Sequence, residues 1–300
     1  MKMKIAFAAV LAAMLASASG CSINTNESAA SAAAENSAAS AGESLAASED
    51  GKAAENAASV TLKGSSAEIG AGASGVTAEG STVTLTVAGE YTFSGTLDDG
   101  QIVVNAPKTD KIDIYLNGVT VNCSTTAPLR VIQADGVTLH LNEGTVNTFT
   151  DSVNSSANAC ISSKDDLTVK GKGKGKLVVT GSVKHAIKSS NDLRIKGGEL
   201  ELSAKAAGLY GEDSVQLTGG NIVIKSCKDG IKSVIDEGGE AGKGTVTSEN
   251  ATVDIQNASG NGIEATTSVT VTSGSIKIHS IKQAVNCKTQ TLAEGTVVKY

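Results

Sequence analysis

Three segments of this chain align without gaps, and this internal repeat constrains the fold more than any other feature. They are Leu193–Leu202, Val215–Ile224 and Val269–Ile278. Each reads as two short strands of alternating apolar and polar residues that meet at a glycine or a serine–glycine pair. Val215 lies 22 positions after Leu193, and Leu209 lies 22 positions after Ile187. Self-similarity at such a short period is typical of a solenoid.

A unit of this length cannot bury its own apolar face, but stacked neighbouring units can. Leu193 is then expected over Val215, and Leu200 over Ile222, at a spacing of about 4.8 Å. We predict an all-β fold, a right-handed parallel β-helix with about 22 residues per coil, because parallel crossovers are overwhelmingly right-handed. A propeller would need about 40 residues per blade, and a sandwich would not keep so strict a register.

The N-terminal residues predict export. Lys2 and Lys4 precede an apolar run that is too short to span a bilayer, so residues 1–20 are expected to be a signal peptide. Small residues stand directly before Cys21, and this sequence resembles the bacterial lipobox, in which the cysteine is lipidated. We therefore expect an exported lipoprotein, anchored in a membrane by Cys21 and displayed at the cell surface. The alternative is an ordinary signal peptide followed by an unmodified cysteine.

Composition divides the rest of the chain in two. Residues 21–58 are almost all small or polar, so they are expected to form a disordered spacer that cannot bury enough apolar surface to fold. Residues 59–300 are expected to form the β-helix, with an aliphatic core because the chain has no Trp, 4 Tyr and 3 Phe. Removal of the leader with its two lysines changes the formal net charge from −6 to −8, which argues against a nucleic-acid partner.

The turns before the first strand of three successive repeats are acidic. They read Lys164-Asp165-Asp166, Ser190-Asn191-Asp192 and Glu212-Asp213-Ser214. Carboxylates stacked at strand spacing repel one another, and Ca²⁺, which takes six to eight oxygen ligands, would relieve the repulsion. The candidate calcium ligands are Asp165, Asp166, Asp192, Asp213 and Asp229. Two alternatives stay open, namely neutralisation by neighbouring lysines in surface ion pairs and simple capping of turns by aspartate.

Lysines recur in the same register. Lys184 and Lys228 are equivalent when counted through Ala206, and Lys188 and Lys232 form a second row. Such rows would suit the repeating carboxylates of an acidic polysaccharide, although a solvated surface explains any single lysine equally well. Tyr210 follows a core leucine in the alternation, so it is expected to face outward and to stack on a sugar. The candidate ligand-binding residues are Lys184, Lys188, Lys228, Lys232 and Tyr210.

Several further segments carry a family resemblance. They are Gly89–Leu97, Asp99–Val104, Ser163–Leu167, Lys184–Lys188, Asn191–Leu193 and Asp229–Lys232. In order and spacing, across residues 59–300, they resemble the bacterial calcium-binding β-helix proteins that bind polysaccharide and are related in fold to family 9 pectate lyases. The resemblance implies extracellular polysaccharide binding and bound calcium. The chain departs from the family pattern at Ala207 and Asn261, which occupy the position of Asp229 in the adjacent coils.

The leading functional prediction is a cell-surface lipoprotein that binds extracellular polysaccharide without cleaving it. An acidic glycan such as polygalacturonate suits the composition, with cellulose as a further candidate. The first alternative is a calcium-dependent, pectate-type polysaccharide lyase, with Lys188 or Lys232 as the base that removes a proton beside the uronate carboxylate. The second is a structural or adhesive surface solenoid that has no ligand.

Overall fold

The computed structural model describes residues 56–235 and 240–300, and these form strands and turns with no helix. The signal peptide, Cys21 and nearly all of the expected spacer lie outside the described residues. β1 (Ala57–Gly64) begins just before the boundary expected at residue 59. No helix of the described part is long and apolar enough to cross a lipid bilayer.

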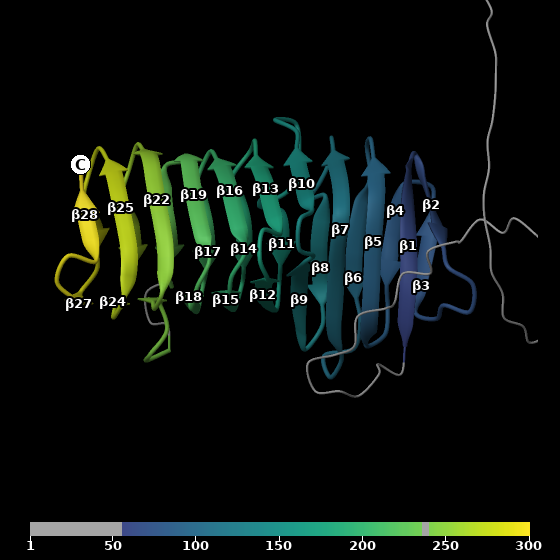
Figure 1. The fold of residues 1–300 in the computed structure, drawn as a ribbon, viewed down its shortest axis with the longest axis horizontal. Coiled ribbons are helices and arrows are strands. Elements are labelled where there is room, and N and C mark those ends of the chain that lie inside the picture. The colour runs from purple at the N-terminus through teal and green to yellow at the C-terminus, as the bar shows by residue number, and fades with distance from the viewer. Residues whose placement is uncertain (1–55, 236–239) are drawn as a thin grey trace, which may run out of the picture. The chain divides into compact units, whose positions relative to one another are not determined.

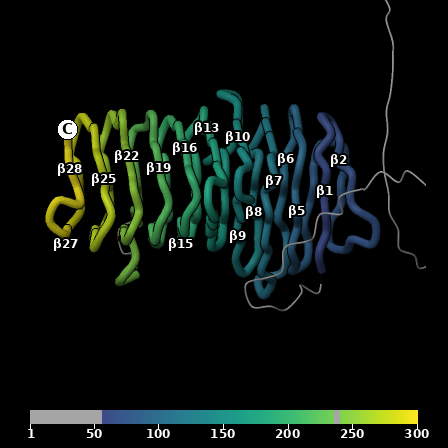
Figure 2. Tube along the Cα trace, viewed as in Figure 1, coloured from purple at the N-terminus to yellow at the C-terminus, as the bar shows by residue number. Residues whose placement is uncertain are grey.

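The described chain winds into a parallel β-helix whose strands stack coil upon coil (Figure 1). Ten strands form one sheet, which we call sheet B, and eighteen form the other, sheet A. Strands of sheet A fall into two rows, because each complete coil contributes two consecutive strands to sheet A and then one to sheet B. The path of a single coil can be followed in the trace of Figure 2. The predicted parallel β-helix is thereby confirmed.

Each row has its own set of strands. The first row of sheet A holds β5 (Gly89–Leu97), β7 (Lys111–Cys123), β9 (Gly136–Leu141), β12 (Asp166–Gly171), β15 (Asp192–Ile195), β18 (Ser214–Leu217), β21 (Thr245–Ser248), β24 (Ser268–Val271) and β27 (Thr289–Leu292). The second row holds β10 (Val146–Asp151), β13 (Lys176–Gly181), β16 (Glu199–Ala204), β19 (Asn221–Ser226), β22 (Ala251–Ala258), β25 (Gly274–Ser280) and β28 (Val297–Lys299). The long strands β5 and β7 run through both rows, and β1 pairs along the whole of β5.

Sheet B carries the strands that matter most for the site. In chain order these are β3 (Val76–Glu79), β4 (Thr82–Leu85), β6 (Gln101–Asn105), β8 (Leu129–Gln133), β11 (Ala159–Ser163), β14 (His185–Ser189), β17 (Ala207–Gly211), β20 (Asp229–Ser233), β23 (Ile263–Ala265) and β26 (Val285–Asn286). All but the β3–β4 pair are parallel.

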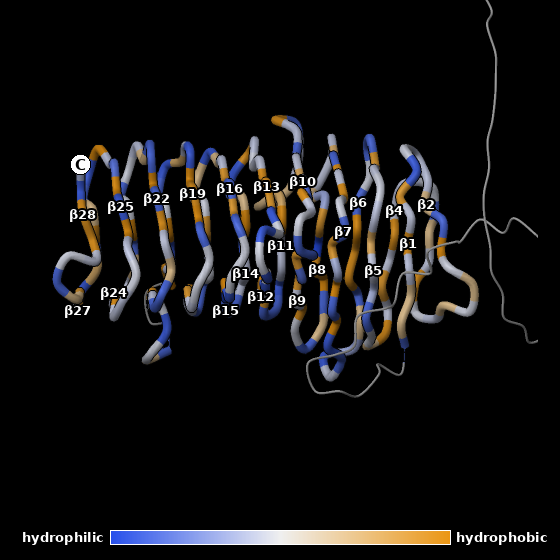
Figure 3. Tube along the Cα trace, in the orientation of Figure 1, coloured by the Kyte–Doolittle hydropathy of each residue, from blue (hydrophilic) through white to orange (hydrophobic). Residues whose placement is uncertain are grey.

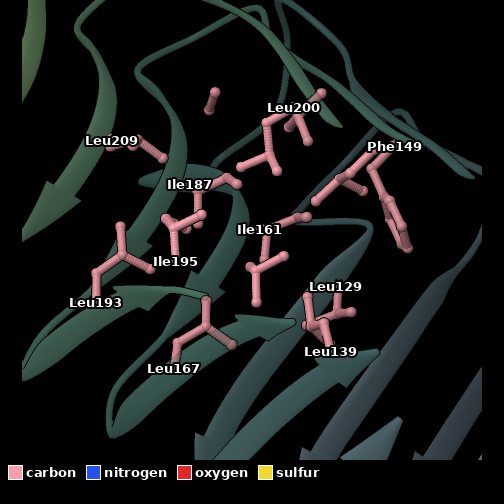
Figure 4. Packing of buried hydrophobic residues seen from close by; sticks show 14 of the residues in the cluster. Leu129, Leu139, Phe149, Ile161, Leu167, Ile187, Leu193, Ile195, Leu200 and Leu209 are labelled. Atoms are coloured by element: carbon pink, nitrogen blue, oxygen red, sulfur yellow. The ribbon is translucent and has the colours of Figure 1, made fainter. Parts of the chain in front are cut away.

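The core consists of aliphatic ladders that run along the solenoid. Leu193 pairs with Val215 and Leu200 with Ile222, as the repeat predicted. In sheet B, Ile187 pairs with Leu209, and both side chains are fully buried (Figure 4). Apolar and polar residues alternate along the strands, which gives the banded pattern of Figure 3. Burial of each such side chain stabilises the fold by roughly 1.5–3 kcal/mol.

Two polar side chains lie among these ladders. Asn147 uses its whole amide, because Oδ1 accepts from the backbone N–H of Gly118 and Nδ2 donates to the carbonyl oxygen of Lys176. Asp151 is only 3% exposed, and its Oδ1 accepts from the backbone N–H of Ser182. Its other oxygen has no hydrogen-bond partner among the described residues. Burial raises the pKa of Asp151, and the hydrogen bonds from Ser182 only partly oppose this.

The two ends of the solenoid close differently. At the N-terminal end, β2 (Ser66–Ile69) folds back antiparallel on β1, and β3 folds back antiparallel on β4. At the C-terminal end, the last coil changes the chemistry of two inward positions. Gln290 pairs with the buried Val269, and Lys299 pairs with the buried Ile278, so polar residues replace apolar ones.

Candidate functional site

The outer face of sheet B brings three of the predicted ligand-binding residues into one column. Lys188 of β14 pairs with Tyr210 of β17, which pairs in turn with Lys232 of β20. Each of the three follows a core aliphatic residue and precedes a buried serine or glycine, so strand alternation turns these three side chains outward. Glu264 of β23 continues the column.

Tyr210 is held in place by contacts on both sides. The Lys188 ammonium lies 5.2 Å from the centroid of the Tyr210 ring. The His185 imidazole lies against the same ring, with 4.8 Å between centroids and an interplanar angle of 53°. The Tyr210 hydroxyl donates to the carbonyl oxygen of Val234 at 3.1 Å. The ring is therefore a fixed element of the surface, contacted by a cation and an imidazole.

Carboxylates already accompany both lysines of this column. Lys188 Nζ lies 2.5 Å from Glu212 Oε1, and Lys232 Nζ lies 2.8 Å from Glu264 Oε2. Lys232 Nζ also lies 3.8 Å from Asp229 Oδ2. A glycan carboxylate could bind either ammonium only by competing with these partners.

His185 completes this group and is fixed as a neutral hydrogen-bond donor. Its Nδ1 accepts from the backbone N–H of Ala207 at 3.0 Å, so the proton of the neutral ring is assigned to Nε2. Burial, followed by the positive charges of Lys188, Lys232 and Lys184, lowers the pKa of His185 to about 4, against the raising effect of Asp229. The ligand-binding residues predicted from the sequence did not include His185, although it stands between Lys184 and Lys188 in the chain.

Asp229 belongs to a column of register neighbours, and most of them accept a hydrogen bond from the backbone of the next coil. Its Oδ1 accepts from the N–H of Asn261 at 2.9 Å, and Asn261 Oδ1 accepts from the N–H of Gln283 at 3.3 Å. His185 and Ala207 precede Asp229 in this column. The carboxylate is thus buried in a structural ladder, with Lys232 as its charged neighbour.

The acidic turns of sheet A are bridged by an arginine. Asp166 and Asp192 lie side by side, as predicted, and the N–H of Asp192 donates to Asp166 Oδ1 at 3.2 Å. Arg194 Nη1 lies 2.7 Å from Asp166 Oδ2, and Arg194 Nη2 contacts Asp192 Oδ2. The guanidinium therefore supplies the positive charge that stacked carboxylates require. Arg194 was missed, although it stands two residues after Asp192 and so shares its face of the strand.

The remaining two acidic candidates also have protein partners. Asp165 is buried and accepts from the N–H of Ala134 at 3.1 Å, with Lys108 Nζ at 3.5 Å. Asp213 pairs with Lys243 at 2.9 Å. Over residues 56–235 and 240–300, no group of three or more histidine, cysteine or acidic side chains is placed to hold a metal ion. Each of the five aspartates thus has at least one carboxylate oxygen in contact with an ammonium, guanidinium or N–H group of the protein.

A second lysine column is much more exposed. Backbone hydrogen bonds connect Lys184, Ala206, Lys228, Gly260 and Lys282 in successive coils, at the corner that leads into sheet B. We call Lys184, Lys228 and Lys282 the lysine row. All three are exposed, and none forms an ion pair with a described residue. Lys184 Nζ donates to the neutral amide of Asn158 at 2.9 Å.

A further aromatic pair lies at the N-terminal part of sheet A. The rings of Tyr115 and His140 stack with 4.3 Å between centroids and 12° between planes. His140 Nε2 lies 2.7 Å from Asp113 Oδ1. Burial, followed by the charge of Asp113, raises the pKa of the neighbouring Glu90, while His140 lowers it. Stacking of register neighbours accounts for this pair as a stabilising contact between coils.

The free cysteines lie mostly inside the fold. Cys123, Cys160 and Cys227 are buried, and Cys287 is half-buried. Burial raises the pKa of the Cys227 thiol to about 12 and raises that of Cys160 well above its ordinary value. These thiols are therefore poor nucleophiles at neutral pH.

Comparison with known proteins agrees with this fold. A solved structure of a polysaccharide lyase-like protein from C. thermocellum, a gadolinium derivative, is 32% identical with a TM-score of 0.76. That match covers 81% of this chain and 99% of the other. A carbohydrate-binding domain-containing protein of Acetivibrio thermocellus is 38% identical over 130 residues, which is 41% of this chain. The match spans 45% of that relative's length.

The sequence profile of the carbohydrate-binding domain-containing proteins matches residues 79–298. This range contains every strand of sheet B after β3, together with both lysine columns and the acidic turns. The chain therefore belongs to the family of carbohydrate-binding domain-containing proteins.

Proposed function

We propose that this protein binds an acidic extracellular polysaccharide through the exposed corner of sheet B. The observation that carries the proposal is the lysine row, in which Lys184, Lys228 and Lys282 are exposed and have no carboxylate partner in the described chain. Ammonium groups of this kind attract an anionic polymer without first giving up an ion pair. Lys188, Tyr210 and Lys232 lie on the adjacent face and would extend the contact once Glu212 and Glu264 are displaced.

The setting of the binding domain is part of the same proposal. An exported chain lipidated at Cys21 would hold the β-helix off the membrane on the segment that precedes residue 59. A right-handed winding with coils of about 22 residues would carry the lysine row along one corner. Metabolic labelling with a fatty-acid analogue, compared between the natural chain and a Cys21→Ser variant, tests the anchor. Equal labelling of the two would refute it.

Calcium binding at the acidic turns stays a separate prediction. It is supported by the structural neighbour, which was solved as a gadolinium derivative, since lanthanides and Ca²⁺ both favour hard oxygen ligands. The contacts of Arg194 with Asp166 and Asp192 argue against it, because the arginine would have to leave. Metal analysis of the purified mature protein gives a direct answer.

Retention on insoluble polysaccharide tests the main proposal. The mature protein is expected to be retained by polygalacturonate, less by cellulose, and to lose retention as salt screens the lysines. A Lys184→Ala/Lys228→Ala variant is expected to elute earlier. The matched control is Lys196→Ala/Lys277→Ala, which removes two exposed lysines elsewhere on the solenoid. Equal retention of the two variants, or no retention of the natural chain on any acidic glycan, would refute the proposal.

A lyase is the second candidate, favoured by the name of the structural neighbour and by two lysines that flank Tyr210. A lysine that acts as a base must be neutral, whereas Lys188 and Lys232 are both paired with carboxylates, which favour the charged ammonium. We therefore expect no unsaturated uronate on incubation with polygalacturonate. Ultraviolet absorbance of the unsaturated product is the assay, and its appearance in natural protein but not in Lys188→Met would establish the lyase instead.

A further inference from the structure

The lysine row has a period of two coils. Lysine alternates with the smallest residues, because Ala206 lies between Lys184 and Lys228, and Gly260 lies between Lys228 and Lys282. Backbone hydrogen bonds of 2.6–3.0 Å connect each of these residues to the next, so the row follows the solenoid axis without interruption. Adjacent coils of parallel strands are about 4.8 Å apart, which separates successive lysines by roughly 10 Å.

The absence of a lysine at position 260 of the row is explained by packing. A Cβ atom placed there would lie 2.4 Å from Asp229 Oδ1 and 2.9 Å from the carbonyl oxygen of Lys228. Asp229 cannot move away easily, since it is buried and accepts the N–H of Asn261. Any side chain at this position must therefore displace Asp229 or the neighbouring backbone, which disfavours a lysine on every coil of the row.

Two further lysines lie near the row, since the exposed Lys205 directly precedes Ala206 and Lys299 Nζ donates to the carbonyl oxygen of Lys282 at 2.6 Å. Asp229 lies beneath Gly260 and faces Lys232. His185 follows Lys184 in the chain, and it is neutral and bound to the backbone of Ala207. The register positions of the row itself therefore alternate between lysine and a small, uncharged residue, with Lys205 beside the step at Ala206.

We infer that the lysine row selects a linear acidic polysaccharide that lies along the solenoid axis and carries a negative charge on every second sugar. An extended, β-linked hexopyranose chain advances by roughly one coil spacing per sugar. A polymer with one carboxylate in two sugars then places each carboxylate over a lysine and each neutral sugar over Ala206 or Gly260. A polymer with a carboxylate on every sugar places half of them over uncharged steps, where they lose solvent without gaining a partner. This inference rests on the proposed function and specifies its ligand.

The test compares two end-labelled acidic oligosaccharides that carry the same number of carboxylates with a neutral one. Hyaluronate oligosaccharides have one carboxylate per two sugars, oligogalacturonates have one on each sugar, and cello-oligosaccharides have none. By fluorescence anisotropy, the natural chain is expected to bind hyaluronate oligosaccharides more tightly than oligogalacturonates. Each lysine-to-alanine substitution in the row is expected to weaken that binding about twofold to fivefold, as for exposed ion pairs.

An Ala206→Lys variant makes the test specific to the period. It places cations on three successive coils, Lys184, position 206 and Lys228, so the preference is expected to shift toward oligogalacturonates. A rise in affinity for both polymers by the same factor would show a general polyanion surface and overturn the inference, while leaving the proposed function standing. Absence of binding to either acidic oligosaccharide would overturn both. The Lys196→Ala/Lys277→Ala variant, with its exposed lysines elsewhere, is expected to keep the natural preference.

Discussion

Removing the charge of Arg194 should expose the repulsion that this residue neutralises. In an Arg194→Met variant the stem still packs on the sheet, but Asp166 and Asp192 lose their common partner. Two carboxylates at neighbouring-strand distance, about 5 Å, repel by about 3 kcal/mol at an effective dielectric constant of 20. The two side chains are 35% and 26% exposed, so solvent reduces the expected loss of stability to about 1–2 kcal/mol.

Urea and thermal unfolding at neutral pH measure this loss. For a domain of this size the midpoint temperature should fall by about 2–8 °C. Addition of Ca²⁺ should restore stability to the variant, because a cation that binds only the folded state stabilises it by mass action. If Arg194 alone neutralises the two carboxylates, the natural chain should be indifferent to both Ca²⁺ and EDTA.

The matched control is Gln216→Met, since Gln216 is the register neighbour of Arg194 and has no ion pair. It should unfold like the natural chain at neutral pH. Two results would refute the reasoning. One is an Arg194→Met variant that is as stable as the control at neutral pH. The other is a natural chain that loses stability in EDTA, since a cation would then already be bound to the carboxylates of the folded protein.

Three more predictions concern buried groups. Burial raises the pKa of Asp151, so the folded protein loses stability as the pH rises and this carboxyl becomes charged. Asp151→Asn should therefore stabilise the protein at pH 7 and have no effect near pH 3, as judged by urea unfolding. Gly260→Ala should destabilise by about 1–3 kcal/mol through its clash with Asp229, whereas Gly136→Ala, with its nearest contact at 3.7 Å, should be close to neutral in the same assay. The His185 ring should titrate near pH 4 by NMR, and stability should fall as pH drops from 6.5 toward 4, because the folded state resists protonation; a titration near 6.5 would contradict its burial.

Sequence predicted the ladders of the core well. A repeat with constant spacing specifies which residues stack, so the pairs Leu193–Val215 and Leu200–Ile222 followed directly from counting. The column from Lys184 to Lys228 followed in the same way, through Ala206. Where residues are inserted, as before β21, counting fails locally, but the hydrogen-bonded register resumes with Val215 paired to Val246.

The chemistry of the site was harder to predict because it depends on where side chains turn. Counting placed Asp166 beside Asp192 but could not show that Arg194 reaches back to both. Counting also treated the two lysine columns as equally good binding sites, although Lys188 has a carboxylate partner and Lys228 has none among the described residues. The alternation placed Tyr210 outside, but the contacts of its ring with Lys188 and His185 arise from rotamers that no periodicity specifies.

The last described coil carries polar side chains at positions where the coil before it carries core residues. Any coil of such a solenoid offers its open edge as a template for another strand, as the end of an amyloid fibril does. Here Gln290 and Lys299 turn polar groups toward that edge, so a further copy docked there would have to desolvate them. Trimming the chain back to Ser280 would leave Val269 and Ile278 at the open end. Molecules shortened in this way would be prone to join end to end into filaments.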